Sequence, residues 1–378
     1  MNIKNIILKN EKKYNKEIIF LNMSPWKKKW LKDFFYSAKK IYILKNKEIK
    51  NFNDDFFKNK LIIHWGIDYS KEVLNLKKKF KIYIMEDGFI RSKNLGSDLE
   101  APASLSIDSN GIHFNPEYKT DLENLLNEYK LTEIDLKNGK ELLNLFLNNS
   151  ISKYNSFDNN LPNIYKKKNI INKKKILIIG QVEDDASIRY GSPLIKSNLE
   201  LIKLVSNRYK KEDNFIIYKP HPDVFINNRK GKVSEEELKK YCDYIDTTSK
   251  MADLLSLNNI EVHTITSLSG FESLIHKNKT YCYGIPFYSG WGLTEDYIID
   301  NEAYKRRNKK RTLLEIFTIS YIIYPLYFDY EKKIFTSPEI IINKISNQKN
   351  SFIYLFFKRK FLYIIRFFKK IRKILRKK

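Results

Sequence analysis

The sequence predicts an α/β protein with two domains, each built on a parallel sheet. Three observations support this: a length of 378 residues, short apolar runs that alternate with helical patterns, and a polar connector near the middle of the chain. The length exceeds that of one typical domain. Strands that alternate with helices predict parallel sheets with helices on both faces. An apolar share of 42% is enough for two cores, and only 12 Gly and 10 Pro argue against disorder.

The first domain is expected over residues 1–155. Its elements are strands at 18–21, 41–44, 61–65 and 81–85 and helices at 25–38 (N-cap Ser24) and 121–149. The last strand leads into Glu86-Asp87-Gly88-Phe89, which is either an ordinary turn or a functional loop with two carboxylates. A loop is expected over 92–115, and loops this long in compact domains are usually functional. An Asn- and Lys-rich connector that ends near Lys174 predicts the domain boundary.

The second domain is expected over residues 175–311. It opens with Ile176–Ile179, an apolar β-branched run of the length that a buried parallel strand needs. Its other expected elements are helices at 194–210 and 251–257 and strands at 215–218, 260–263 and 281–283. Residues 312–347 are expected to be helical and to cross back to the first domain.

The loop after the opening strand of the second domain carries three carboxylates, Glu183, Asp184 and Asp185. Open α/β sheets bind their ligands at the carboxyl ends of strands, and carboxylates that repel one another are seldom placed there for stability. The alternative interpretation is a solvated acidic turn in which Asp184 or Asp185 is a helix N-cap.

Two further strand ends carry groups suited to an anionic ligand. Lys219-Pro220-His221-Pro222 holds a histidine between two prolines that fix its backbone, although a lone histidine is often structural. A helix that starts at Ser267 would direct free backbone N–H groups at a phosphate, unless the serine is only an N-cap. An anionic donor held between two α/β domains is the arrangement of a nucleotide-sugar transferase.

Several protein classes are excluded by missing motifs. The sequence has no G-x-G-x-x-G, no G-x-x-x-x-G-K-[ST] and no G-x-S-x-G, which argues against a dinucleotide dehydrogenase, a P-loop NTPase and an α/β-hydrolase. The only cysteines, Cys242 and Cys282, form no C-x-x-C pair. They fit a reducing, cytosolic compartment and not a structural zinc site. The first twenty residues lack an apolar core, so no signal peptide is expected.

Residues 358–378 hold eleven basic residues and no acidic one, so this stretch supplies eleven of the 26 net positive charges. Residues 351–378 alternate apolar clusters with cations, as in a helix that lies on an anionic membrane surface. The alternatives are a core helix with a basic face and a disordered basic end. We therefore expect a peripheral protein on the cytoplasmic face of the inner membrane.

Six segments carry a family resemblance, in the order EDGFIRSKNLGSDLEAPASLSID, SKYN, GQVEDDASIRYGSP, YKPHPDV, VHTITSLSGFESLIHK and YGIPFYSGWGLT. They resemble the KpsC-type capsule polysaccharide proteins, retaining β-Kdo glycosyltransferases that build the Kdo linker of lipid-anchored capsules. The resemblance runs from about Trp65 to Asp329. Many members carry two modules in tandem, and this single module resembles the C-terminal one. The first sixty residues and the basic tail lie outside it.

The resemblance implies a GT-B fold, in which two Rossmann-like domains face a cleft, with CMP-β-Kdo as donor and a lipid-linked, Kdo-primed acceptor. It implies double displacement, with Asp185 as the nucleophile that attacks the anomeric carbon and Glu86 as the acid/base. No metal cofactor is expected, and other capsule assembly enzymes are expected partners. The expected donor contacts are His221, Thr266 and Ser267 at the CMP phosphate and Gln181, Lys219 and Glu272 elsewhere on the donor.

Two rival functions come from other classes. One is a related GT-B transferase with another CMP or CDP donor, such as a sialyl- or glycerophosphate-transferase, whose phosphate loops would look alike. The other is a non-enzymatic protein that binds nucleic acid or a membrane surface, which the net charge of +26 suggests. No recognised nucleic-acid module is present, so nucleic acid is not an expected partner.

Overall fold

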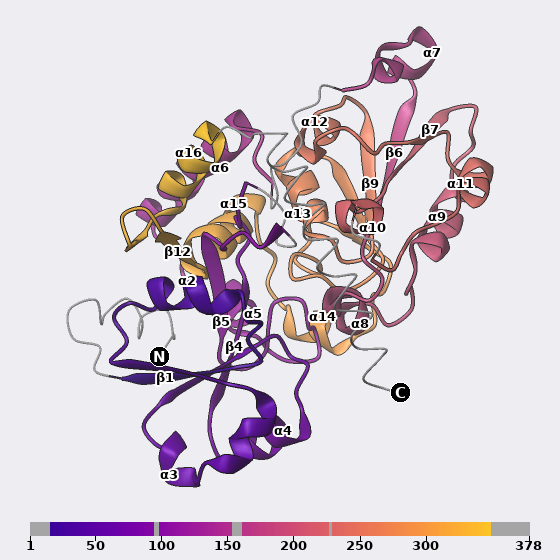
Figure 1. Cartoon of the computed structure of the whole chain (residues 1–378). Helices are drawn as coiled ribbons and strands as arrows, with labels where there is room; N and C mark the ends of the chain where they lie inside the picture. Colours follow the sequence, from indigo (N-terminus) through magenta and orange to yellow (C-terminus); the bar gives the residue numbers. More distant parts are fainter. Residues whose placement is uncertain (1–15, 94–97, 153–160, 227–228, 349–378) are drawn as a thin grey trace.

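Two β-sheets, each covered by helices, form the two domains of the computed structural model (Figure 1). The structure describes residues 16–93, 98–152, 161–226 and 229–348. The basic tail predicted at 351–378 lies outside the described residues. The predicted α/β class with two parallel-rich sheets is confirmed.

The N-terminal domain contains a mixed sheet of seven strands in the order β13-β12-β5-β4-β3-β1-β2. Strands β1 to β4 are parallel, whereas β5, β12 and β13 join the edge in antiparallel pairs. The bounds are β1 Glu17–Leu21, β2 Lys40–Leu44, β3 Leu61–Trp65, β4 Ile82–Asp87, β5 Ser104–Asp108, β12 Leu326–Asp329 and β13 Ile334–Thr336.

Three of these strands differ from the sequence prediction. Strand β5 lies inside the expected loop at 92–115, because every second residue of Ser104–Asp108 is polar and yet buried, so no apolar run marks it. Strands β12 and β13 interrupt the stretch at 312–347, which is therefore not helical throughout. Periodicity cannot separate a short buried strand from a buried helix. The expected return to the first domain is present, because β12 pairs with β5.

The C-terminal domain contains a sheet of six strands in the order β11-β10-β9-β6-β7-β8, all parallel. Residues Ile176–Ile179 of β6 are at most 2% exposed, as expected for a central parallel strand. The bounds are β6 Lys174–Ile179, β7 Asn214–Lys219, β8 Tyr244–Ile245, β9 Ile260–Thr264, β10 Lys279–Cys282 and β11 Glu295–Asp296.

Helices cover both sheets (Figure 1). In the N-terminal domain they are α2 Lys27–Phe34, a 3₁₀ helix at Asn46–Asn51, α3 Asp54–Phe57, α4 Lys71–Lys77, α5 Asp121–Glu128 and α6 Glu133–Asn148. In the C-terminal domain they are a 3₁₀ helix at Asn163–Lys166, α7 Lys168–Ile171, α8 Ala186–Gly191, α9 Asn198–Ser206, α10 Pro222–Ile226, α11 Glu235–Tyr241, α12 Met251–Leu255, α13 Leu268–Ile275 and α14 Glu302–Arg306. The returning segment adds α15 Leu313–Thr318, a π-helical turn at Ile319–Ile323, and α16 Pro338–Asn347, which lies beside α6.

One of the hydrophobic clusters is shared by the two domains. Phe89 of the N-terminal domain stacks on Phe287 of the C-terminal domain with ring centroids 4.8 Å apart. Phe271 of α13 packs against Tyr321 of the returning segment, and all four side chains belong to one buried cluster. This core fixes the sheets relative to each other beside the space between their strand ends.

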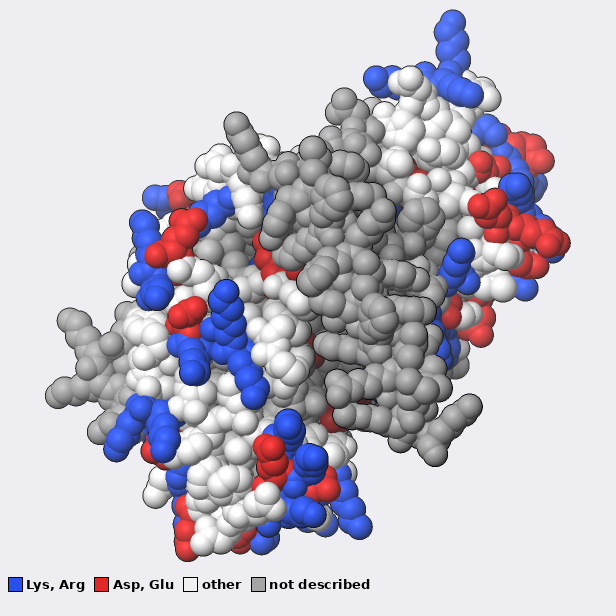
Figure 2. Space-filling view, in the orientation of Figure 1, with Lys and Arg blue, Asp and Glu red and all other residues white. Residues whose placement is uncertain are grey.

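The charged surface of the described residues is mixed. On the face in Figure 2, basic side chains lie interspersed with acidic ones on both domains. Within the described part of the chain, none of the helices combines the length and the hydropathy that a membrane span requires.

Candidate active site

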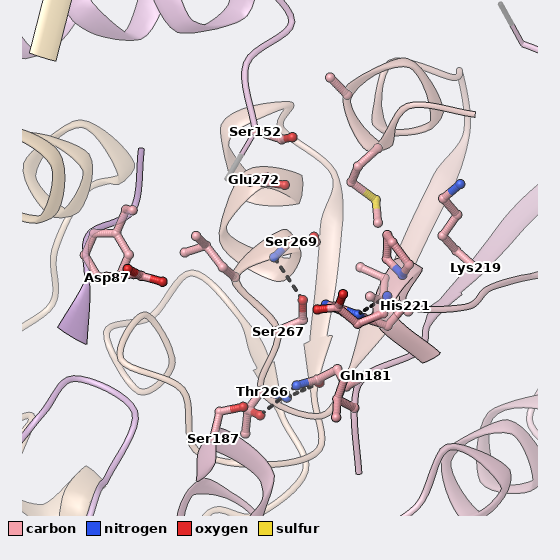
Figure 3. Close-up of a pocket in the computed structure, with 18 of the residues that line it drawn as sticks. Asp87, Ser152, Gln181, Ser187, Lys219, His221, Thr266, Ser267, Ser269 and Glu272 are labelled. Carbon is pink, nitrogen blue, oxygen red and sulfur yellow. Dashed lines mark hydrogen bonds between the residues drawn. The ribbon is translucent and has the colours of Figure 1, made fainter. Parts of the chain in front are cut away.

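A cavity of about 750 Å³ lies between the domains. The loops after β6, β7 and β9 line one wall, and the end of β4 with the segment after it lines the other (Figure 3). This is the position at which open α/β sheets bind ligands. The eight predicted site residues all line this cavity: Glu86, Gln181, Asp185, Lys219, His221, Thr266, Ser267 and Glu272.

The three carboxylates of the acidic loop have different surroundings. Glu183 accepts a hydrogen bond from the backbone N–H of Asn198 at 2.8 Å. Asp184 is exposed and forms an ion pair with Arg229, with 2.9 Å between the nitrogen and oxygen atoms. Of the three, Asp185 alone lines the cavity. The structure thus distinguishes one carboxylate in a loop where the sequence offered three.

Asp185 is also the N-cap of α8. Its Oδ1 accepts hydrogen bonds from the backbone N–H of Ser187 at 2.9 Å and from the Ser187 hydroxyl at 2.8 Å. The alternative interpretation of the loop, a helix N-cap, is therefore confirmed at this residue. The cap does not exclude chemistry, because the hydrogen bonds through Oδ1 hold the carboxylate in one orientation at the cavity edge.

Gln181 connects two of the strand-end loops. Its Oε1 accepts from the backbone N–H of Thr266 at 2.8 Å, and its Nε2 donates to the Thr266 hydroxyl at 3.1 Å. This pair of contacts fixes the orientation of the amide, because the backbone N–H can only meet an acceptor. Since the Thr266 oxygen accepts from Gln181, its own proton is directed elsewhere and can donate to a ligand. Figure 3 shows both side chains at the same wall.

Ser267 is the N-cap of α13, which is the alternative interpretation of this serine, and it lines the cavity together with Leu268 and Ser269. Its hydroxyl accepts from the backbone N–H of Ser269 at 3.2 Å, and its own N–H donates to the Thr264 hydroxyl at 3.1 Å. The positive end of the helix dipole therefore faces the cavity, and anions are stabilised at such a position.

His221 is held in one tautomer by its own loop. Its Nδ1 accepts from the backbone N–H of Asp223 at 3.1 Å, so in the neutral ring the proton is on Nε2. The imidazole is thereby a hydrogen-bond donor through Nε2, which suits a phosphate oxygen.

Lys219 lies deeper than His221 and is 5% exposed. Its Nζ donates to the backbone carbonyl of Ser249 at 2.6 Å and lies 3.4 Å from Oδ1 of Asp246. Burial lowers the pKa of Lys219, whereas Asp246 acts in the opposite direction. Figure 3 shows Lys219 pointing away from Gln181 and Thr266. In this structure it supports the Ser249 segment of the wall, and a direct donor contact stays a prediction.

Glu272 lies on α13, one turn after Ser267, and is 3% exposed. Its charge adds to burial in raising the pKa of Tyr321, which comes from the returning segment. Glu272 therefore lies at the junction of the cavity with the shared core.

The opposite wall is built on β4, which extends to Asp87, two residues beyond its predicted end. Glu86 and Asp87 thus belong to the strand and line the cavity. Asp87 accepts from Nε of Arg91 at 2.7 Å, and the Arg91 guanidinium is buried. Gly88 is required because a side chain there would clash with Ser104 of β5, whose backbone carbon would lie 3.0 Å from the added Cβ.

Comparison with known proteins decides the family. The sequence model of the family described as "Capsule polysaccharide biosynthesis protein" matches residues 61–331. The chain belongs to this family.

Two curated proteins are similar to most of the chain. The capsule polysaccharide modification protein LipA of Neisseria meningitidis serogroup B is 37% identical over 349 residues, which cover 89% of this chain and 47% of that protein. The lipopolysaccharide-processing protein LpsZ of Rhizobium meliloti is 32% identical over 82% of this chain and 70% of that protein. The chain therefore spans about half the length of the meningococcal relative.

Two solved structures from Thermosulfurimonas dismutans have the same fold. The KpsC β-Kdo 2,7-transferase is 31% identical with a TM-score of 0.66, and the match covers 88% of this chain and 99% of that one. The KpsC β-Kdo 2,4-transferase is 26% identical with a TM-score of 0.72, covering 88% and 98%. The resemblance to KpsC-type proteins and the GT-B fold class are confirmed.

The cavity also contains charged or polar residues to which the sequence analysis assigned no role. They are Asp87, Lys93, His113, Ser152, Asp223, Arg229, Ser249, Lys250 and Ser269. Most of them lie in the motif segments, and His113, Arg229, Ser249 and Lys250 lie outside them. Ser152 begins the SKYN segment, whose resemblance to the family was the one available signal for it. The described residues hold no group of three or more His, Cys, Asp or Glu side chains suited to a metal ion.

Proposed function

We propose that this chain is a retaining β-Kdo glycosyltransferase of capsule polysaccharide synthesis. Family membership and the two KpsC transferases support a capsule-related glycosyltransferase. The finer proposal is that Kdo passes from CMP-β-Kdo to a Kdo-primed glycolipid by double displacement, without a metal ion. One observation carries it: all eight residues inferred from the sequence line a single cavity, with one carboxylate of the acidic loop among them.

In the first step the Asp185 carboxylate attacks the anomeric carbon C2 of the donor. A bond from Asp185 to C2 forms, and the bond from C2 to the phosphate oxygen breaks with its electron pair on CMP. Negative charge grows on the phosphate, and preorganised donors stabilise it. The Nε2–H of His221, the Thr266 hydroxyl and the N-terminus of α13 at Ser267 are the donors proposed for this role.

In the second step an acceptor hydroxyl attacks C2 and displaces Asp185. Glu86 takes the proton of that hydroxyl as the new glycosidic bond forms, and later releases it to solvent. Two inversions at C2 give net retention. Glu86 lies on the wall opposite Asp185, which is where an acid/base for the entering acceptor is needed.

The acceptor proposal extends to the membrane. A lipid-linked acceptor is found at the inner membrane surface, and the basic segment 351–378 would hold the protein there. Deletion of 351–378 should abolish binding to anionic liposomes and spare transfer to a soluble Kdo acceptor. Flotation of the truncated protein with such liposomes at high salt would contradict this role.

The test of the catalytic proposal compares two neighbouring carboxylates. Asp185→Asn should lose transfer by on the order of 10³-fold while CMP still binds. Asp184→Asn is the matched control, because Asp184 is also exposed but does not line the cavity and is paired with Arg229. It should change transfer by less than about tenfold. Similar rates for Asp185→Asn and wild type would show that Asp185 is not the nucleophile.

The donor and the covalent step need separate readouts. CMP-Kdo should be turned over, whereas CMP-sialate and CDP-glycerol should not; turnover of either in its place would favour the rival transferases. In Glu86→Gln the second step is slowed, so intact-mass spectrometry after incubation with CMP-Kdo should show protein heavier by one Kdo residue. The adduct should be absent from the double variant with Asp185→Asn.

A further inference from the structure

A buried lysine lies beside the wall that carries Glu86. Lys27, the first residue of α2, is 7% exposed, and its Nζ lies 2.7 Å from the ring centroid of Trp65 at the end of β3. The ring of Trp26 lies 5.9 Å from the same nitrogen. A cation over an aromatic face is stabilised by the ring quadrupole. This enclosure is apolar, so the charge of Lys27 needs a carboxylate to offset its burial.

The carboxylates of β4 supply that charge. Glu86 is the group that most favours the ammonium form of Lys27, and Asp87 follows. Asp87 is already bonded to the buried Arg91 at 2.7 Å. A Glu86 carboxylate oxygen would lie 3.1 Å from a Cβ added at Gly66, the residue after Trp65, so this carboxylate lies beside the end of β3 on which Lys27 packs. The charged groups around Lys27 are thus Glu86 and Asp87 from β4 and Arg91 from the segment after it. The aromatic rings around Lys27 are those of Trp26, the N-cap of α2, and Trp65, the last residue of β3.

The effects that favour and disfavour the charged form of Lys27 nearly cancel. Burial is the largest effect on its ammonium group and, with the charge of Arg91, lowers the pKa of Lys27 to about 7 against the attraction of Glu86 and Asp87. A methionine could fill the same apolar space without this cost. Lys27 is therefore a buried amine whose charge depends on the carboxylates of β4.

Lys27 does not line the cavity, whereas Glu86 does. Any effect of Lys27 on a ligand therefore passes through the two carboxylates of β4, and Asp87 is already held by Arg91. We propose that Lys27 is a positioning residue that orients the Glu86 carboxylate toward the cavity and favours its ionised form, ready to accept the acceptor proton. This inference rests on the proposed acid/base role of Glu86.

The test is the pH dependence of kcat/KM in Lys27→Met, with Lys28→Met, an exposed neighbour on the same helix, as control. A nearby cation lowers the pKa of a carboxyl group by about one to three units. Loss of the Lys27 cation should therefore move the acidic limb of the kcat/KM profile to higher pH by about one unit or more. Transfer at acidic pH should then fall about tenfold per unit of that displacement, and the two curves should converge at alkaline pH. Lys28→Met should superimpose on wild type.

A conservative variant separates charge from packing. Lys27→Arg keeps the cation, so its acidic limb should stay at the wild-type position even if its rate falls. An equal loss at every pH in Lys27→Met, or a limb that moves as far in Lys27→Arg, would overturn the inference. If Lys27→Met does not fold, Lys27→Gln takes its place in the same comparison.

Glu86→Gln distinguishes this inference from the function on which it rests. If Glu86→Gln transfers Kdo normally, the acid/base role and the role of Lys27 both fail. If Glu86→Gln loses transfer and the limb of Lys27→Met stays in place, the inference about Lys27 fails alone. Loss in Glu86→Gln together with a displaced limb in Lys27→Met supports both.

Discussion

Among the described residues, ionic contacts join the domains at two places, which differ most in burial. Glu123 of α5 meets Arg306 and Arg307 with shortest nitrogen-to-oxygen distances of 2.6 and 3.4 Å, and the Glu123 and Arg307 side chains are 4% and 3% exposed. Asp68, after β3, meets Arg189 of α8 at 2.8 Å, but these side chains are 59% and 45% exposed. Similar chemistry at these two sites therefore has different energetic consequences.

The buried contact is part of a larger network. Arg307 also donates to the backbone carbonyls of Pro286 and Ser289, and Arg311 donates to those of Leu126 and Tyr129 at the end of α5. Removing one partner of such a set leaves uncompensated buried charge, which costs several kcal/mol. Breaking this contact is therefore costly.

The exposed contact is weaker and can open. An exposed ion pair contributes about 0.2–1 kcal/mol, and here the hydroxyl of Tyr190 adds a hydrogen bond to Asp68 at 3.2 Å. Both Arg189 and Tyr190 belong to α8, the helix that Asp185 caps. The comparison predicts that any opening of the cavity would begin at α8, beside the proposed nucleophile, and not at α5.

The largest effect is expected for Glu123→Gln. This change leaves Arg306 and Arg307 without their carboxylate, and the free energy of unfolding should fall by about 3–5 kcal/mol. Denaturant unfolding measures it, with Glu128→Gln on the same helix as control. Glu128 is exposed and pairs only with Lys119 among the described ion pairs, so its loss should cost less than about 1 kcal/mol. An equal loss of stability in Glu123→Gln and Glu128→Gln would mean that burial does not make the Glu123 contact stronger than an exposed ion pair.

An intermediate effect is expected for Gly139→Ala in α6. The added methyl group would clash with the side chain of Thr318, which follows Phe317 on α15. Overpacking of this kind costs about 1–3 kcal/mol of folding free energy. Because α15 belongs to the returning segment, this loss weakens the packing of that segment on the N-terminal domain. Lys140→Ala, an exposed change in the same helix, should leave the melting temperature nearly unaltered. Thermal unfolding of both variants checks this, and a Gly139→Ala variant as stable as wild type would show that the helices can move apart freely.

The smallest effect on stability is expected for Asp68→Asn. The free energy of unfolding should change by less than about 1 kcal/mol, yet the ionic-strength dependence of kcat/KM should weaken because the exposed charge pair between the domains is gone. Asp55→Asn is the matched control, since Asp55 is exposed and pairs with Lys58 inside α3 and its flank. An unchanged salt dependence in Asp68→Asn would remove the argument that this contact governs opening.

Most strands were predictable from the sequence because they are apolar and β-branched. Residues 61–65 match β3, and the strands predicted at 18–21, 41–44 and 260–263 are each one residue short of β1, β2 and β9. The missed strand β5 has buried polar side chains, and its place in the sheet depends on pairing with β4 and β12 rather than on its own pattern. Helix α2 begins at Lys27 after Trp26, later than the Pro25 start that Ser24 suggested.

The candidate site, like the fold, was predictable from the sequence only in part. Motifs at strand ends were sufficient to name residues that meet in one cavity, because parallel strands bring their carboxyl ends to one edge of a sheet. The sequence could not show that Asp185 lines this cavity whereas Glu183 and Asp184 do not. It also gave no sign of Lys27, since a lysine in a basic helix does not reveal that tertiary packing encloses it.

The pairing of β12 with β5 has a consequence for biosynthesis. On the ribosome, strands β1 to β5 emerge long before residues 326–336, so the N-terminal sheet waits for the whole C-terminal domain to be made. Until then β5 presents an unpaired edge, a template for wrong pairing between nascent chains. The C-terminal sheet, whose strands lie within residues 174–296, has no such delay. The second domain to be synthesised is therefore the first that can close, and it folds beside a partner that is still incomplete.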